Sequence, residues 1–158
     1  MGLARHLQAT ASSSHRVQVA GWPFVREQCN NRAEEAVGNA TDIWTAYREG
    51  RFGDFPAPFV GYFFLLEECP AVHKIVTNVE PYFQVDPIFA EASYAKRYQV
   101  LCERLMLERL YTACCLTLST KPTSGEPTSV SHPTQSLSFG RFAAAIEAHA
   151  HVFRSALN

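Results

Sequence analysis

Between residues 30 and 67 the spacing of apolar positions changes from a helical to a strand-like pattern. Small and aromatic residues first recur at steps of four and three: Ala33, Val37, Ala40, Trp44 and Tyr47. Asn31, followed three residues later by Glu34, forms a variant of the capping box, and Gly50 supplies a stop. The pattern therefore predicts an amphipathic helix over residues 30–50.

A near-continuous apolar run follows at residues 59–66, after a connector rich in glycine and proline. The run is long enough for a strand and too short for a stable helix. Runs of this kind are typical of strands that are covered on both faces. A capped helix that leads into a buried strand is half of an α/β layer.

The rest of the chain continues the same alternation. Residues 17–20 predict a short strand, 93–111 a helix capped by Ser93, and 113–119 a second covered strand. A segment rich in Ser, Thr and Pro, 120–135, predicts a surface loop before a last helix that Ser138 caps. On that helix we expect an inner face of four residues: Phe139, Phe142, Ile146 and Phe153. The predicted fold class is α/β, with helices packed on a largely buried sheet.

Composition is that of an ordinary globular protein. The 158 residues fit one domain, with 47% hydrophobic and 18% charged residues. A formal charge of −1 gives no overall basic footprint, which counts against a nucleic-acid coat protein. This net charge does not exclude an enzyme that binds DNA in a local cleft. No apolar run reaches the ~18 residues of a membrane span, so no membrane partner is expected.

Five cysteines lack the spacing of a disulfide framework, which favours reduced thiols and a cytoplasmic location. Cys114 and Cys115 are adjacent in a predicted strand and should point to opposite faces. We interpret them as core residues and keep a thiol enzyme as a minor alternative, because neither a nearby base nor positive charge is evident. Cys69 and His73 form a lone C-x3-H pair without the second pair that zinc usually requires, so no metal ligand is predicted.

The first 25 residues contain no acidic residue and carry a serine run at 12–14. An organelle transit peptide and a poorly ordered tail both fit this composition. We expect residues 1–29 to form a divergent, poorly ordered segment, and residues 30–158 to form the folded domain.

Long strings in the chain are more specific than a generic α/β protein requires. In order and spacing, residues 30–50, 59–68, 92–119 and 137–146 resemble the XhoI-type family of type II restriction endonucleases. The resemblance implies a PD-(D/E)xK nuclease, with a restriction-endonuclease-like core of a mixed sheet flanked by helices. It also implies double-stranded DNA as substrate, Mg²⁺ held by an Asp and a Glu-x-Lys motif, and a homodimer.

The expected motif departs from this family. The residues that begin at Gln18 correspond to a Gln-Val-Gly stretch that follows the Glu-x-Lys, so the motif falls on Ser14, His15 and Arg16. Serine cannot replace a carboxylate ligand, and arginine lacks the compact ammonium of lysine. The strands that carry the first Asp are also expected to be missing. We therefore expect an incomplete, catalytically inactive core. If two or three inner strands are missing, residues 59–66 form an exposed sheet edge and the chain is prone to aggregation.

Other residues are weaker candidates for the site. Glu34 and Glu35 could supply a metal-site carboxylate, although a favourable charge in the first helical turn is the preferred interpretation. For nucleic-acid binding, the resemblance points to the mouth of the cleft at Asn30, Asn31 and Arg32. We interpret the charged side of the next helix as a solvated face. The alternative is that its basic residues contact phosphates: Lys96, Arg97 and Arg104.

Two functional hypotheses remain open from the sequence. The first is a site-specific deoxyribonuclease of a restriction–modification system, inactive in this chain. The second is a non-catalytic remnant that binds DNA or a partner chain. Detectable Mg²⁺-dependent cleavage of duplex DNA distinguishes the two.

Overall fold

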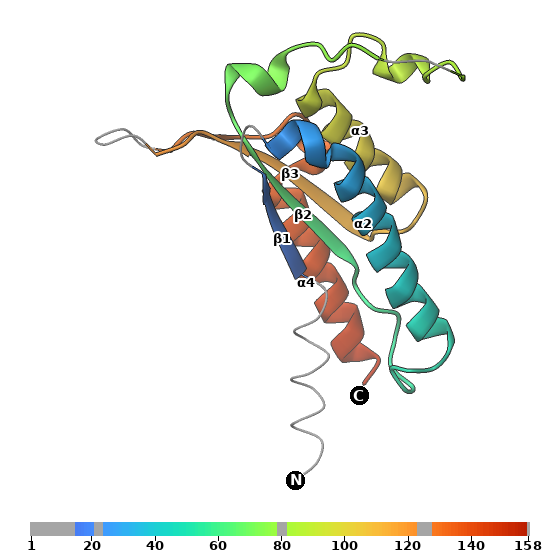
Figure 1. Cartoon of the computed structure of the whole chain (residues 1–158). Helices are drawn as coiled ribbons and strands as arrows, with labels where there is room; N and C mark the ends of the chain where they lie inside the picture. Colours follow the sequence, from blue (N-terminus) through green and yellow to red (C-terminus); the bar gives the residue numbers. More distant parts are fainter. Residues whose placement is uncertain (1–14, 21–23, 79–81, 123–127, 158) are drawn as a thin grey trace.

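The structure is a computed structural model that describes residues 15–20, 24–78, 82–122 and 128–157. It consists of one sheet between two layers of helices (Figure 1). The strands are β1 (His15–Ala20), β2 (Gly61–Glu67), β3 (Ala113–Ser119) and β4 (Val130–Ser131). The α-helices are α2 (Phe24–Arg48), α3 (Tyr94–Leu107) and α4 (Phe139–Ser155). Three short 3₁₀ helices, η1 (Pro70–His73), η2 (Pro87–Phe89) and η3 (Gln135–Leu137), complete the described elements.

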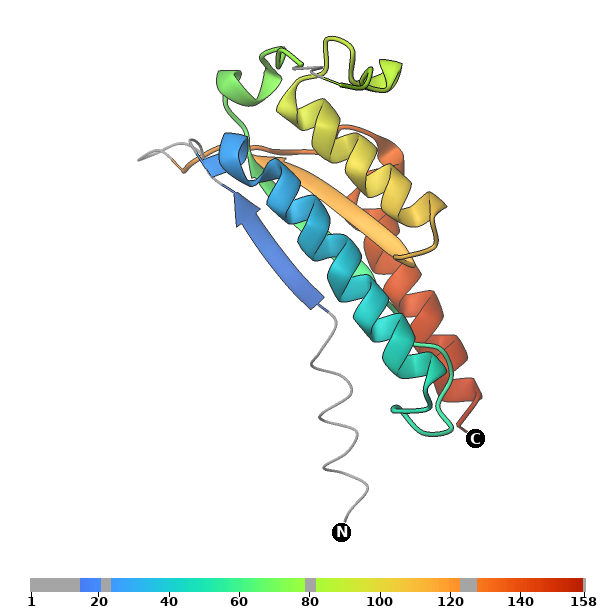
Figure 2. The ribbon, with the colours of Figure 1, turned by 45° about the vertical axis from the view of Figure 1, so that its right-hand side comes forward.

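The sheet is mixed, with strand order β1-β2-β3-β4. The first three strands are parallel, and β4 pairs antiparallel with the end of β3. Parallel neighbours require crossover connections, which α2 and α3 provide. Figure 2 shows these two helices side by side on one face of the sheet, with α4 on the other. The predicted α/β class, a mixed sheet flanked by helices, is confirmed. No helix in the described part of the chain is long and apolar enough to cross a membrane.

The start of the first long helix was predicted wrongly. α2 begins at Phe24, so Asn31 lies inside the helix and caps nothing. Residues 24–30 contain neither glycine nor proline, and nothing in them stops the helix from extending toward the N-terminus. The predicted stop is confirmed, because Gly50 adopts a positive φ of 70° directly after the last turn. The predicted boundary at residue 29 lies within this helix.

The buried stripe of α2 also differs from the predicted one. Ala36 and Ala40 are fully buried, whereas Val37 is 44% exposed. The core therefore contacts α2 at Ala36, one residue before the predicted Val37, and the two patterns agree again at Ala40. The spacing of small residues is a poor guide to which face of a helix is buried, because alanine is accepted on either face.

Strand positions were predicted more closely. β3 has the predicted bounds, and β2 is shifted by one or two residues. The expectation that residues 59–66 form a sheet edge is wrong, because β1 pairs with β2 from His15–Gly61 to Ala20–Leu66. In the described sheet β2 is therefore an inner strand. The segment 120–135 is also more than a loop, since two of its residues form β4 against Leu118 and Ser119.

Both predicted serine caps are confirmed. The hydroxyl oxygen of Ser93 accepts a hydrogen bond from the backbone N–H of Lys96 at 3.2 Å. That of Ser138 accepts from the N–H of Arg141 at 3.4 Å. Each serine satisfies one N–H that the first helical turn leaves without a partner.

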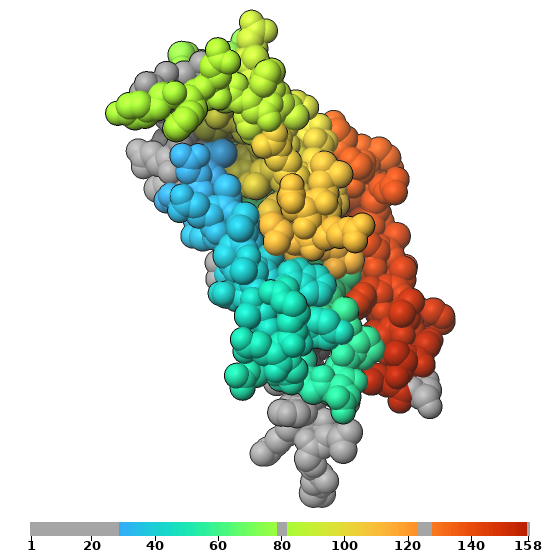
Figure 3. Space-filling view, turned by 90° about the vertical axis from the view of Figure 1, so that its right-hand side faces the viewer, coloured from blue at the N-terminus to red at the C-terminus, as the bar shows by residue number. Residues whose placement is uncertain are grey.

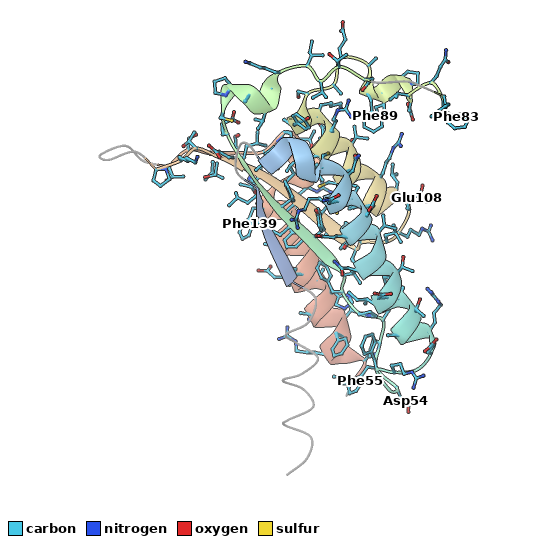
Figure 4. The ribbon with its side chains drawn as sticks, in the orientation of Figure 1. Asp54, Phe55, Phe83, Phe89, Glu108 and Phe139 are labelled. Atoms are coloured by element: carbon cyan, nitrogen blue, oxygen red, sulfur yellow. The ribbon has the colours of Figure 1, made fainter. Side chains whose placement is uncertain are left out.

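The sheet separates two hydrophobic clusters. Cys114 belongs to the cluster under α2 and α3, and Cys115 to the smaller one under α4, so the prediction of opposite faces is confirmed. On α4, Phe142 is buried and Ile146 packs against the smaller cluster. Phe139, predicted to face inward, is 56% exposed, although its ring makes an edge-to-face contact with Phe63 of β2. It is the first residue of the helix (Figure 4).

Candidate nucleic-acid interface

The expected Glu-x-Lys position falls at the start of the edge strand. Ser14 lies outside the described residues, and Arg16 and Gln18 lie on β1, paired with Tyr62 and Phe64 of β2. The position inferred for the motif from the sequence therefore lies on β1, next to the inner strand β2. Strand location is the property that the nuclease motif requires, although the residue types differ.

The two candidate carboxylates lie in the middle of α2, not in its first turn as predicted, because the helix begins earlier. Glu34 is exposed. A carboxylate oxygen of Glu35 lies 2.7 Å from the Arg32 guanidinium, one turn away on the same helix. The charge of Glu35 is therefore already partly balanced by an arginine at an i,i+3 spacing.

Three predicted nucleic-acid contacts lie on consecutive residues of α2. Asn30 and Asn31 are exposed, and 25% of the Arg32 side chain is accessible. Arg32 faces α3, where its positive charge acts on the Tyr98 hydroxyl; burial nevertheless raises the pKa of Tyr98 above its usual value. The two asparagines are thus the accessible part of this group, and Arg32 is also part of the α2–α3 contact.

The two candidates on α3 are in different environments. Lys96 is exposed in the first turn. Arg97 is half-buried, donates to the side-chain oxygen of Asn78, and lies over the Phe89 ring at 5.6 Å from its centroid. The ammonium of Lys96 is available to solvent, whereas the Arg97 guanidinium already holds the connection between β2 and α3.

The sequence analysis missed these contacts between α3 and the connection that precedes it. Arg104 also lies over the Phe89 ring, at 5.4 Å from its centroid, and pairs with Asp86 at 2.6 Å, and Asn78 donates to the Phe89 carbonyl at 3.1 Å. Figure 4 shows Phe89 beside the start of α3. The spacing of Arg97 and Arg104, two turns apart on one helix face, is the only signal in the sequence. It does not identify the partner, which lies in a separate connection.

Comparison with known proteins identifies the scaffold that carries these residues. The family model of the restriction endonuclease XhoI matches residues 8–130, which include β1, β2 and β3. The chain belongs to the XhoI restriction endonuclease family. The resemblance inferred from the sequence strings is therefore confirmed, and with it the restriction-endonuclease-like fold class. No solved structure matches the chain.

Several curated relatives in the XhoI family are type II restriction enzymes. BstVI of Geobacillus stearothermophilus is 50% identical over 99 residues, which are 63% of this chain and 44% of that protein. XhoI of Xanthomonas vasicola is 49% identical over 86 residues, 54% of this chain and 35% of the relative. AbrI of Azospirillum brasilense is 51% identical over 62 residues, 39% of this chain and 28% of the relative. The chain spans less than half the length of each of these enzymes.

Mg²⁺, the cofactor that the XhoI family implies, needs carboxylate ligands that converge on one point. The described side chains contain no group of three His, Cys, Asp or Glu residues that could hold a metal ion. Near the end of β2, Glu68 is paired with the His73 imidazole, Oε1 to Nε2 at 2.6 Å. Cys69 and His73 therefore belong to no larger group of possible metal ligands in the described region, and this donor set does not fit Mg²⁺.

The thiols near β3 lie in the core. Cys102 and Cys114 lie close together in the larger cluster, and the contact with Cys114 together with burial raises the pKa of the Cys102 thiol. Burial likewise raises the pKa of Cys115. Because the thiolate is the reactive form, the raised pKa values of Cys102 and Cys115 disfavour a nucleophilic role at neutral pH. All five cysteines are free, and the core interpretation accounts for the adjacent pair.

Proposed function

We propose that this chain binds double-stranded DNA in the cytoplasm, as part of a type II site-specific deoxyribonuclease scaffold, and that it does not cleave DNA by itself. The observation that supports this most strongly is the match of residues 8–130 to the restriction endonuclease XhoI family. Relatives about half identical to it over the shared region carry the name of type II restriction enzymes.

The proposed lack of cleavage depends on residue chemistry at the motif position. The Glu-x-Lys of the nuclease core corresponds to Ser14 and Arg16 in this sequence. A neutral hydroxyl does not supply the hard anionic oxygen that Mg²⁺ prefers, and a planar guanidinium does not present the compact charge of lysine. Mg²⁺, when bound in an intact enzyme of this class, positions and activates water and stabilises charge on the phosphate. We assign no step of that chemistry to Glu34 or Glu35.

DNA binding needs groups that remain accessible. Asn30 and Asn31 present amide donors and acceptors on the surface of α2, and Lys96 presents an ammonium at the start of α3. Amides hydrogen-bond to phosphate oxygens or base edges, and the ammonium attracts the phosphate backbone. We propose that Arg32 and Arg97 border this interface and keep α2 and α3 in place beneath it.

Two measurements on the purified chain test the proposal. The first follows unmethylated supercoiled plasmid with Mg²⁺ and expects no nicked or linear product, with a commercial type II enzyme as positive control. The second measures binding of a labelled duplex by fluorescence anisotropy and expects salt-sensitive binding that weakens in N30A/N31A and K96Q variants. Cleavage that disappears when Mg²⁺ is chelated would overturn the inactive assignment, and absence of duplex binding would overturn the DNA-binding one.

A partner-binding role is the second candidate. β1 has β2 as its one neighbour among the described strands, and an edge strand presents backbone groups that can pair with another chain. A homodimer, as the family implies, is the partner we propose. Light scattering coupled to gel filtration checks it: a mass of one chain across a wide concentration range contradicts the homodimer.

A further inference from the structure

A pocket of about 360 Å³ lies at the opposite end of the α2–α3 layer from Asn30 and Lys96. Its walls come from the second half of α2 and from the turn that joins α3 to β3. Six residues line it: Thr41, Trp44, Arg48, Glu108, Arg109 and Leu110. Figure 3 shows the face on which these two segments meet, and Figure 4 places Glu108 on the outer side of the turn.

The two walls are fixed to each other by a direct hydrogen bond. The indole N–H of Trp44 donates to the carbonyl of Leu110 at 2.9 Å. Thr41, Trp44 and Arg48 follow one another at steps of three and four, so they share one face of α2. The pocket is therefore built into the packing of the helices, on a rigid frame.

The pocket carries a positive charge that is not neutralised inside the described part of the chain. Arg48 donates to the Thr45 hydroxyl at 3.0 Å, and neither Arg48 nor Arg109 has a carboxylate oxygen within 4.0 Å among the described residues. Glu108 lines the same pocket and offsets one of the two charges. Two guanidinium groups from separate segments remain able to donate several hydrogen bonds to an anion.

The backbone at Arg109 adds an independent observation. Its φ is 57°, in the left-handed region that favours glycine, at the end of α3 where the N–H groups of Leu110 and Tyr111 both bond to the Leu105 carbonyl. A long charged side chain at a position that glycine fills with less strain indicates a role for the side chain. In this pocket the Arg109 side chain supplies the second guanidinium group.

We propose that Arg48 and Arg109 bind one phosphate group of the DNA backbone in this pocket. The inference rests on the proposed DNA-binding function and extends it to a second contact point. Arg48 follows Asn31 by 17 residues of continuous helix, a distance of about 26 Å along the axis. That corresponds to roughly eight base pairs of duplex at about 3.4 Å each. One duplex laid along α2 therefore reaches both contact points.

Salt dependence of duplex binding tests the phosphate contact. The slope of log K against log salt concentration is measured by fluorescence anisotropy for the wild-type chain and for R48Q, R109G and R141Q. Loss of one phosphate contact should reduce the magnitude of the slope by about 1 in R48Q and R109G. R141Q is the matched control, because Arg141 is exposed on α4, beyond the opposite face of the sheet, and should leave the slope unchanged.

The choice of Arg109→Gly separates binding from folding. Glycine accepts the positive φ at no steric cost, so this variant should unfold at a temperature no lower than the wild type while it loses the contact. Wild-type binding with unchanged slopes in both pocket variants overturns this inference and leaves the proposed function intact.

A wild-type chain that binds no duplex overturns the proposed function, and the pocket is then tested with inorganic phosphate. A phosphate-dependent rise in unfolding temperature that is absent in R48Q and R109G supports a pocket that binds free inorganic phosphate. The same rise in all variants, or none in any, overturns the pocket assignment.

Discussion

The two faces of the sheet are packed very differently. Among the residues whose burial is described, sixteen are buried under α2 and α3, among them Phe64, stacked on Tyr98 with ring centroids 4.3 Å apart. Under α4 the described buried cluster consists of Ala113, Cys115 and Phe142, and Phe139 and Val152 of the helix are 56% and 64% exposed. The same two strands thus support one thick and one thin layer.

This difference indicates where the stability of the described domain comes from. Hydrophobic stabilisation follows the apolar area removed from water, and the α2–α3 face removes more of it. The surfaces proposed for DNA lie on the outside of this same layer. A stable layer beneath a binding surface holds its side chains in position, so changes in the α2–α3 face should affect folding and binding together.

The largest effect is expected at alkaline pH, through the α2–α3 face. Burial raises the pKa of Tyr62 and of Tyr98 above the usual 10.0. A folded-state pKa above the unfolded one gives stability that is fully present below pH 10 and is lost as the pH rises beyond it. Circular dichroism and the part of the tyrosinate absorbance that comes from buried tyrosines should therefore change together in one cooperative step, and Tyr62→Phe should move that step to higher pH. Titration of all six tyrosines in a folded chain would contradict this.

Truncation of the central aromatic residue comes next. Phe64→Ala should lower the free energy of unfolding by about 3–5 kcal/mol, because Phe64 is fully buried and leaves a cavity against Tyr98. Phe142→Ala should cost less, about 2–3 kcal/mol, since the thinner layer can relax and admit water. Urea unfolding measures both. An equal or larger loss for Phe142→Ala would contradict the ranking of the two faces.

Gly61 of β2 tests the packing of the α4 layer from the side of the sheet. A Cβ atom on Gly61 would lie 2.8 Å from the Phe59 ring and 2.9 Å from the Phe142 ring. Gly61→Ala should therefore push Phe142 outward and cost about 1–3 kcal/mol in thermal or urea unfolding. Gly38→Ala is the control, because a Cβ there meets nothing within 4 Å on the exposed side of α2. It should raise stability by about 0.5–1 kcal/mol.

The helix caps should give the smallest effects. Ser93→Ala and Ser138→Ala each remove one hydrogen bond to a first-turn N–H and should each cost about 1 kcal/mol in urea unfolding. Ser93 starts a helix of the thick layer and Ser138 the helix of the thin one. The local hydrogen bond is the same in both, so similar values are expected despite the different packing. A cost several times larger at either serine would show that more than capping is lost.

The elements most visible in the sequence were those encoded by local signals. β3 was predicted to the residue because the run ACCLTLS is mostly apolar and leads into a polar segment, and both serine caps were found from their position before an apolar run. The start of α2 was missed because Asn31 with Glu34 matches a cap within a sequence that also continues as a helix. A local motif cannot exclude a longer helix that packing favours.

The candidate site was less accessible to sequence reasoning. Asn30 and Asn31 were assigned by resemblance and Lys96 from the charged side of its helix, and their contact with DNA remains a prediction. Arg97 was assigned from the same helix side, but its contacts with Asn78 and Phe89 depend on a connection that folds back over α3. The pocket at Arg48 was not predicted, since its two walls are about 60 residues apart in the chain and each looks like an ordinary helix end.

The sequence by itself determined the α/β alternation, the opposite faces of Cys114 and Cys115, and membership of the XhoI family, because periodicity and long strings are local properties of the chain. Tertiary structure alone decided that β2 is an inner strand, that Arg97 and Arg104 both contact the Phe89 ring, and that Arg48 and Arg109 share a pocket. These features depend on which distant segments come together, and that depends on the total burial of the sheet and not on any one segment.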